Sequence, residues 1–159
     1  MSPLSPINEK GNDMEILRFY VPGKPIPQGS KRWLPNHRMV EANKDLRPWR
    51  ATVTSYALQA RHAQQHTTYE GPVLLNLHFT FARPKAHYRT GKHAGLLKTN
   101  APVYMTNTPD VDKLARSIAD AITDARVWRD DSQIAVMTAV KMYGEQPGVT
   151  VEVQPLVAT

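Results

Sequence analysis

The sequence predicts a single α/β domain, of the α+β kind, in which a mixed β-sheet is packed by two main helices. Its 159 residues are the length of one ordinary domain, and 41% of them are hydrophobic, which is enough to bury one core. Two segments show the hydrophobic period of a helix, and four have the composition of strands. No internal repeat divides the chain, so one domain accounts for all of these elements.

The first part of the chain is expected to hold an arm, a strand and a loop. Residues 1–14 are polar, contain proline and lack periodicity, which predicts a flexible arm in front of a domain spanning 15–159. Residues 15–21 are rich in β-branched and aromatic side chains and precede a Pro-Gly pair, which indicates a strand and its end. Residues 24–47 are basic and contain Pro and Gly, and we interpret them as a loop.

The middle of the chain is expected to hold a helix, a central strand and a long connection. The helix runs from about Pro48 to His66, with one apolar face made of Trp49, Val53, Ala57 and Ala60. Residues 73–81 are apolar enough for a central strand. Residues 83–107 show no period, and connections of this length are usually functional or disordered. Their basic side chains favour a mobile arm that touches phosphates, and a solvated disordered insertion is the alternative.

The last part of the chain is expected to hold a second helix and two strands. The helix begins at Thr108-Pro109-Asp110, because threonine can cap a helix, proline suits its first position and acids favour its first turn. It ends near residues 123–125, and its buried stripe is Val111, Leu114, Ile118, Ala121 and Ile122. Residues 133–142 and 149–153 are the expected strands, and the first of them could lie beside this helix.

The distribution of charge is more informative than its total. The net charge of +6 and the pI near 9.7 favour a polyanionic partner such as nucleic acid. Residues 71–109 contain no acid, yet six of the fourteen acids fall between residues 110 and 131. The chain has no cysteine, which excludes disulfides, thiolate metal sites and cysteine nucleophiles and is consistent with a cytoplasmic protein. This concentration of acids in an otherwise basic chain indicates that they have a common function.

The concentrated acids include Asp110 and Asp112 at a helix start and the Asp130–Asp131 pair just before a strand. Phosphodiester hydrolysis needs an activated water and stabilisation of negative charge, and hard divalent cations held by carboxylates provide both. Lys113 or Arg116 could orient the phosphate or offset transition-state charge. Taken alone, acids in a first helical turn are more often surface residues that complement the helix dipole.

Three strings of residues together resemble a known family. These are the helix segment PDVDKLARSIADAI at 109–122, the segment VWRDDSQI at 127–134, and VPGKPIPQGSKR at 21–32. Read together, with P-D-x-D followed by D-D-x-Q at this spacing, they resemble the RusA-type Holliday junction resolvases of bacteria and their phages. The resemblance covers most of the domain, apart from residues 1–14 and parts of 35–70 and 84–106.

The resemblance implies a homodimeric, magnesium-dependent endonuclease that binds four-way DNA junctions and nicks two strands symmetrically, in recombination and repair. Manganese is a possible substitute for magnesium. The metal ligands would be Asp110, Asp112 and Asp131, with Asp130 as the immediate neighbour of the third. The family often carries a functional lysine four residues after the second aspartate, and Arg116 stands there in this chain. Arginine does not readily give up a proton, so an electrostatic role is expected for it.

Basic residues in the loops and at the helix start are the candidates for DNA phosphate contacts. They are Lys24, Lys31, Arg32, Arg83, Lys85 and Lys113. The three tryptophans are more often core or dimer-contact residues than base-stacking ones. The six histidines show no ligand spacing apart from His62 and His66, which are expected to be exposed, so a zinc site is not expected.

Several alternatives stay open at the level of sequence. The substrate could be a fork, a flap or a D-loop, because the choice of branched DNA depends on dimer geometry. A non-catalytic DNA-binding module and a D-x-D sugar-nucleotide transferase are further readings, although no Gly-rich nucleotide turn supports the second. No signal peptide, membrane span or small-molecule cofactor is expected.

Overall fold

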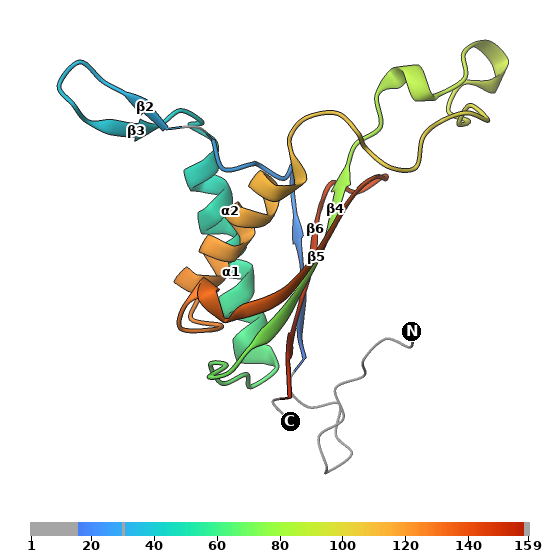
Figure 1. Cartoon of the computed structure of the whole chain (residues 1–159). Coiled ribbons are helices and arrows are strands. Elements are labelled where there is room, and N and C mark those ends of the chain that lie inside the picture. The colour runs from blue at the N-terminus through green and yellow to red at the C-terminus, as the bar shows by residue number, and fades with distance from the viewer. Residues whose placement is uncertain (1–15, 30, 158–159) are drawn as a thin grey trace.

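A four-stranded sheet with both helices on one face forms the body of the protein (Figure 1). The computed structural model describes residues 16–29 and 31–157. The strands lie in the order β1 (Leu17–Pro22), β6 (Gly148–Pro155), β4 (Val73–Phe81) and β5 (Ile134–Tyr143). β6 is antiparallel to β1 and β4, whereas β4 and β5 are parallel, so the predicted mixed sheet is confirmed. The arm expected at residues 1–14 lies outside the described residues.

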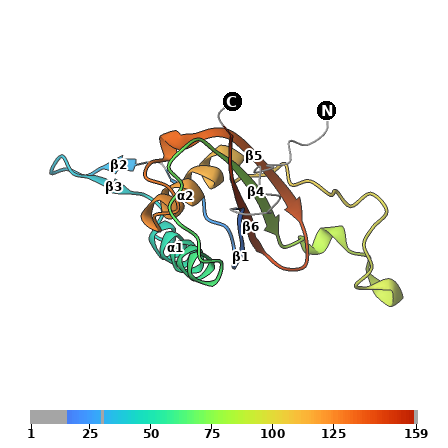
Figure 2. The ribbon, with the colours of Figure 1, turned by 90° about the horizontal axis from the view of Figure 1, so that it is seen from below.

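The core lies between this sheet and the two helices, α1 (Leu46–Ala63) and α2 (Val111–Asp124) (Figure 2). In β4, buried side chains alternate with partly or fully exposed ones along the whole strand. Successive side chains of a strand point to opposite faces of the sheet, so only one face of the sheet is covered. The face of α1 that the sequence predicted is buried, with Leu46 added at its start. Each apolar side chain that is fully buried contributes about 1.5–3 kcal/mol. Among the largest of them are Phe79, Leu114, Ile118 and Trp128.

The start of α2 differs from the expectation. The helix begins at Val111, and Asp110 is its N-cap residue, with an extended backbone (φ −69°, ψ 140°) and no side-chain capping hydrogen bond. The first helical hydrogen bond runs from the amide of Leu114 to the carbonyl of Asp110 over 3.1 Å. Thr108 and Pro109 therefore precede the helix, and the expected threonine cap is wrong. The carbonyl of Pro109 is bound by a lysine side chain instead of a helical amide.

A hairpin interrupts the segment that the sequence presented as a loop at 24–47. It consists of β2 (Lys31–Trp33) and β3 (Met39–Glu41), paired with Lys31 opposite Glu41 and Trp33 opposite Met39. All three side chains of β2 are exposed, so the strand lacks the apolar alternation by which a half-buried strand is predicted. The structure therefore corrects the expected loop by adding this hairpin.

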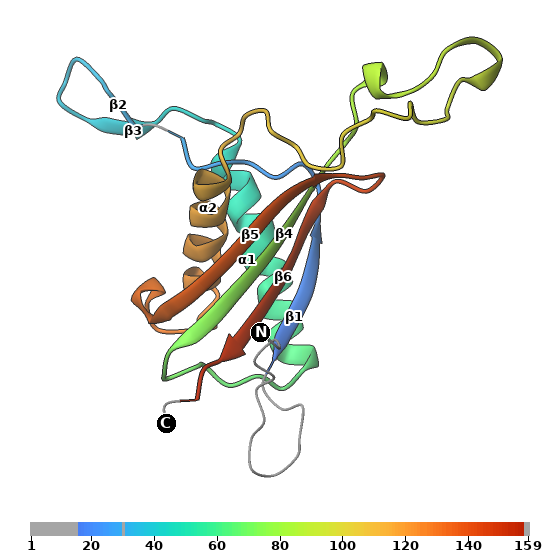
Figure 3. The same cartoon turned by 45° about the vertical axis from the view of Figure 1, so that its right-hand side comes forward.

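A second arm is formed by residues 82–107, which connect β4 to α2. It contains two short 3₁₀ turns at Lys85–His87 and Gly91–His93, and a backbone bridge pairs Tyr88 with Leu97. Arg83 joins the two ends of this arm, because its guanidinium donates a hydrogen bond to the carbonyl of Pro102 over 2.7 Å. Figures 1 and 3 show that this arm and the β2–β3 hairpin project from the same end of the molecule, with the start of α2 between them.

Candidate active site

Asp110 and Asp112 lie at the exposed start of α2. The side chain of Asp110 is 57% exposed, and Asp112 is also on the surface. The first amides of a helix carry partial positive charge, which favours carboxylates at this position. Both groups are therefore open to solvent and to a ligand that approaches from between the two arms.

Two cations belong to the same surface. The ammonium nitrogen of Lys113 lies 3.5 Å from a carboxylate oxygen of Asp110, which is an ion pair between two exposed side chains. Such pairs add little stability, typically about 0–1 kcal/mol, so this contact is weak enough for a phosphate to displace it. Arg116 is exposed one helical turn after Asp112 and shares its side of the helix. The structure thus groups two acids and two cations at the start of α2.

A hollow of about 510 Å³ adjoins Asp110. Its walls come from residues 24–29, from the start of α2 and from two residues that precede α1, namely Asn43 and Asp45. Two hydrogen bonds fix the first of these walls to α2: the amide of Gln28 donates to the carbonyl of Lys113 over 3.0 Å, and the hydroxyl of Ser117 donates to the carbonyl of Ile26 over 2.9 Å. They bring Lys24 and Asp110 to the same hollow.

The Asp130–Asp131 pair forms the entrance to β5. Asp130 accepts a hydrogen bond of 2.7 Å from the amide of Ser132, which lowers the pKa of its carboxyl. The pKa of Asp131 is raised, first by a hydrogen bond with Asp130, then by burial, and then by the negative charges of Asp130 and Asp120. Of these groups, Asp120 shows where Asp131 lies, because Asp120 is in the last half of α2. Asp131 therefore belongs to the end of α2 that lies away from Asp112.

The two pairs of acids are separated within one chain. α2 and β5 run in opposite directions, and β5 continues from Ile134, just after Asp131, to Lys141, whose side chain reaches Pro109. Ile134 and Lys141 are seven residues apart on β5, which at about 3.3 Å per strand residue is roughly 23 Å, and the two pairs of acids lie at opposite ends of this length. Across 16–29 and 31–157, no three His, Cys, Asp or Glu residues lie close enough together to hold a metal ion.

Lys141, for which the sequence predicts no role, also belongs to this surface. Its ammonium group donates to the carbonyl oxygens of Asn107 and Pro109, each over 2.7 Å. It thereby joins the end of β5 to the two residues that lead into Asp110. A single lysine at the end of an apolar strand carries no sequence signal for such a contact, because the partner is the backbone of a segment more than 30 positions away.

The basic candidates are divided between the two arms and the hollow. Lys31 and Arg32 are exposed on β2, and Lys85 is exposed in the first turn of the second arm. Arg83 is partly buried, because it binds Pro102 and lies over the ring of Tyr143 at 5.5 Å. The positive groups thus flank the start of α2 on both sides, and Arg83 holds its arm in addition to carrying charge.

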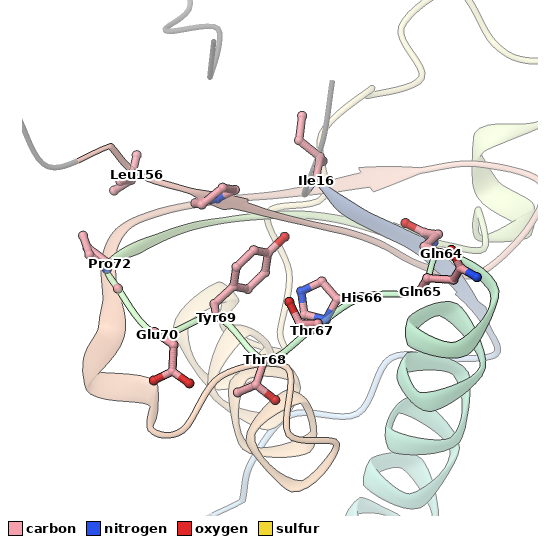
Figure 4. Close-up of a pocket in the computed structure, with 12 residues that line it drawn as sticks. Ile16, Gln64, Gln65, His66, Thr67, Thr68, Tyr69, Glu70, Pro72 and Leu156 are labelled. Atoms are coloured by element: carbon pink, nitrogen blue, oxygen red, sulfur yellow. The ribbon is translucent and has the colours of Figure 1, made fainter. Parts of the chain in front are cut away.

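Another cavity, of about 550 Å³, lies at the end of the molecule away from the arms (Figure 4). Its walls come from the end of α1, the following loop and the end of β6, and His66 and Tyr69 point into it. His66 is only partly exposed, so the expectation of full exposure is wrong, although His62 is exposed as expected. Burial, and then the Arg61 guanidinium, lower the pKa of His66 to about 4. This imidazole is therefore neutral at pH 7.

Two comparisons with known proteins concern the family of this chain. Residues 22–154 match the family described as Endodeoxyribonuclease RusA. The chain is also similar to a protein of Bacillus subtilis (strain 168) named uncharacterized protein YqaN, with 27% identity over 150 residues that cover 91% of this chain and all of that protein. Among the described residues, no helix is long and apolar enough to cross a membrane. The family match contains the start of α2, both arms and the Asp130–Asp131 pair, and the chain therefore belongs to the RusA endodeoxyribonuclease family, whose membership indicates endonuclease activity on DNA.

Proposed function

We propose that this protein is a magnesium-dependent endonuclease that binds four-way DNA junctions as a homodimer and nicks two of their strands symmetrically. The observation that carries the proposal is the position of Asp110 and Asp112, which are exposed at a helix start between two basic arms. A role in recombination and repair follows from the same substrate.

The charges around the start of α2 suit a DNA backbone. Lys24 and Lys113 line the hollow beside Asp110, and further cations lie on the hairpin and on the second arm. Phosphate contacts of this kind position DNA without reading its sequence. They match a substrate that is recognised by its branched shape.

The acids suit a hard divalent cation. Magnesium prefers carboxylate and water oxygens, and Asp110 and Asp112 would provide two such ligands from one chain. When bound, the ion supplies an activated water and offsets charge on the phosphate, and manganese could replace it. Arg116 lies within a helical turn of Asp112, and its permanent charge fits an electrostatic role in place of proton transfer.

The third expected ligand, Asp131, requires a second copy of the chain. Within one chain it lies beside Asp120, and the length of β5 from Ile134 to Lys141, roughly 23 Å at about 3.3 Å per residue, separates it from Asp110. If a second copy placed its own β5 antiparallel to the first, the partner subunit's Asp131 would come to the end of β5 at which Asp110 lies. Two identical sites would then be completed at once, as symmetric nicking requires.

The outer edge of β5 supports this dimer. β5 is the last strand of its sheet, and residues 103–105 pair with its final three residues, so that in the described part of the chain residues 134–140 have a free outer edge. Those seven residues carry no charge, and Val136 and Met137 are 42% and 44% exposed. A long apolar edge is prone to pair with another strand unless it is covered. Antiparallel pairing would also set the acidic entrance of one β5 beside Lys141 of the other copy.

A non-catalytic DNA-binding protein is the second candidate, because one chain alone does not bring three acids together among its described residues. It would use the same arms and the same hollow. The acids would then only stabilise the start of α2 and the turn before β5.

The test is a gel assay with four substrates of equal length: a four-way junction, a fork, a flap and a plain duplex, each with and without magnesium. We expect paired nicks in the junction that depend on magnesium. Cleavage of forks or flaps in preference to junctions would change the substrate within the same chemistry. Tight junction binding without cleavage at any magnesium or manganese concentration would favour the non-catalytic candidate.

A further inference from the structure

Trp33 is unusual among the three tryptophans of the chain. Trp49 and Trp128 are core residues with 6% and 0% exposure, whereas Trp33 on β2 is 66% exposed. Its cross-strand neighbour is Met39, which is 50% exposed. Side chains that face each other across a hairpin lie on the same side of it, so this pair forms one apolar platform in solvent.

The surroundings of this platform are basic. Residues 31–41 contain three lysines or arginines, Lys31, Arg32 and Arg38, and one acid. An apolar surface that docked on another apolar surface would gain nothing from this excess of positive charge. An apolar surface that met an aromatic group next to phosphates would gain from both.

The position of the hairpin connects it to Asp110. The hairpin follows directly on residues 24–29, which line the hollow beside Asp110 and are bound to α2 through Gln28 and Ser117. It projects from the end of the molecule at which α2 begins (Figures 1 and 3). DNA whose backbone lies in the hollow would therefore extend toward Trp33.

We propose that Trp33, supported by Met39, stacks on an unpaired base of branched DNA. The inference rests on the proposed function and deepens it, because it names the feature of the substrate that the hairpin recognises. Bases inside a paired duplex are already stacked and offer no free face, whereas bases at a branch point can be opened. Stacking on an aromatic ring tolerates any base, so it selects for shape and not for sequence.

The protein contains its own reporter for this contact. Because the other two tryptophans are buried, acrylamide quenching of tryptophan emission reports mainly on Trp33. The wild-type protein is titrated, without divalent metal, with a four-way junction, a paired duplex and a single strand of matched length. We expect the junction to change the emission of Trp33 and to protect it from acrylamide, and the duplex to do so much less.

The matched variants are Trp33→Ala, Trp33→Phe and Leu96→Ala, the last at a 55% exposed apolar residue of the other arm. Trp33→Ala is expected to weaken junction binding about tenfold and duplex binding hardly at all, in line with the loss of one stacked base. Trp33→Phe should retain most of the affinity, and Leu96→Ala should leave it unchanged. Equal thermal midpoints would show that the variants are folded, because Trp33 is outside the core.

Three results would overturn the inference, and they are distinguishable from one another. Junction binding without any change in Trp33 emission or acrylamide access would remove the stacking contact but leave the proposed nuclease intact. The Trp33→Ala protein could also dissociate into monomers at concentrations where the wild type is dimeric. That result would show that Trp33 and Met39 contact the partner subunit and not DNA. Absence of DNA binding by the wild-type protein would remove the proposed function together with the inference.

Discussion

The ammonium group of Lys141 donates a hydrogen bond of 2.7 Å to the carbonyl oxygen of Pro109, the residue directly before Asp110. A second bond of the same length reaches the carbonyl of Asn107. The end of β5, an edge strand, thereby holds the backbone that leads into α2. Lys141 is a positioning residue in the proposed nuclease, because it acts on Asp110 through the main chain.

Replacing Lys141 with methionine keeps the length of the side chain and removes both hydrogen bonds. Each hydrogen bond to a charged group is worth about 1.5–3 kcal/mol, and because one of the two bonds is exposed to solvent we expect the free energy of unfolding to fall by about 1.5–3 kcal/mol in total. A misplacement of about 1 Å can cost about 10²-fold in rate, and we expect junction nicking to fall by 10- to 100-fold. Denaturant titration and single-turnover nicking measure the two effects.

Lys141→Arg and Lys92→Met are the controls for that prediction. Arginine can still donate to two carbonyls and should restore part of the nicking rate while affinity for the junction stays constant. Lys92 is exposed on the second arm, so its replacement should leave the free energy of unfolding unchanged. If Lys141→Met nicked as fast as the wild type, the positioning role would be wrong.

Asp110→Asn is expected to abolish magnesium-dependent nicking and to preserve junction binding. The amide keeps the shape of the side chain but is a far poorer ligand for a hard cation. Loss of a negative charge beside phosphates could tighten binding, which an electrophoretic shift assay at constant salt would record. Full cleavage by this variant would refute the proposed site, and Asp124→Asn, near the far end of α2, provides a control at an exposed acid.

Mixed dimers decide whether the site is shared between subunits. Asp110→Asn and Asp131→Asn proteins should each be inactive alone, yet a mixture that exchanges subunits should nick single strands. In a mixed dimer, one site would contain both substitutions, whereas the other would contain Asp110 of one chain and the partner subunit's Asp131, both intact. If each chain built its own site, both sites of the mixed dimer would stay damaged and no activity would return.

The edge of β5 can be tested without DNA. Met137 is the middle residue of the free edge at 134–140, so in a two-fold antiparallel pair two copies of it would face each other. Met137→Lys would oppose two positive charges there, and we expect dimer dissociation to become at least about tenfold more favourable, since like charges in an interface cost several kcal/mol. Sedimentation equilibrium measures this, with Thr150→Lys on an inner strand as the control. An unchanged dimer would place the interface elsewhere.

His66 gives the protein a predictable loss of stability in weak acid. The pKa of His66 is about 4 in the folded protein and about 6.5 in an unfolded chain. Between these values only the unfolded state binds the proton, so the free energy of unfolding should fall as the pH drops from about 6.5 to about 4. We expect a loss of about 1–2 kcal/mol, less than the full shift because the ring is only half-buried.

His66→Phe tests that assignment, because it keeps a ring beside Tyr69 and removes the titration. Urea unfolding at a series of pH values should give a flatter profile for this variant than for the wild type. His62→Phe replaces an exposed histidine in the last turn of α1, just before the loop that contains His66, and should leave the profile unchanged. Identical profiles for the wild type and His66→Phe would show that another group is responsible.

The sequence predicted most of the body of the fold, because burial leaves a periodic record along the chain. The alternating run of β4 lies at the bounds that the sequence predicts, and the predicted apolar face of α1 is buried, although it lacks Leu46. The start of α2 was placed too early, because capping preferences describe isolated helices and take no account of Lys141. The β2–β3 hairpin was missed because its exposed side chains leave no such record.

By itself, the sequence determined the fold class, the family resemblance and the residues whose chemistry suits a divalent cation, since these depend on residue types and on short spacings. Only the tertiary structure decided which of those residues meet. Asp110 and Asp131 are 21 positions apart in the sequence, but α2 and β5 run in opposite directions and carry them to opposite ends of the body. The same folding brings Lys24 and Lys141 close to Asp110, although both are far from it in the sequence. Hydrogen bonds to backbone carbonyls hold them there, and such bonds join segments that are neighbours in space and not in sequence.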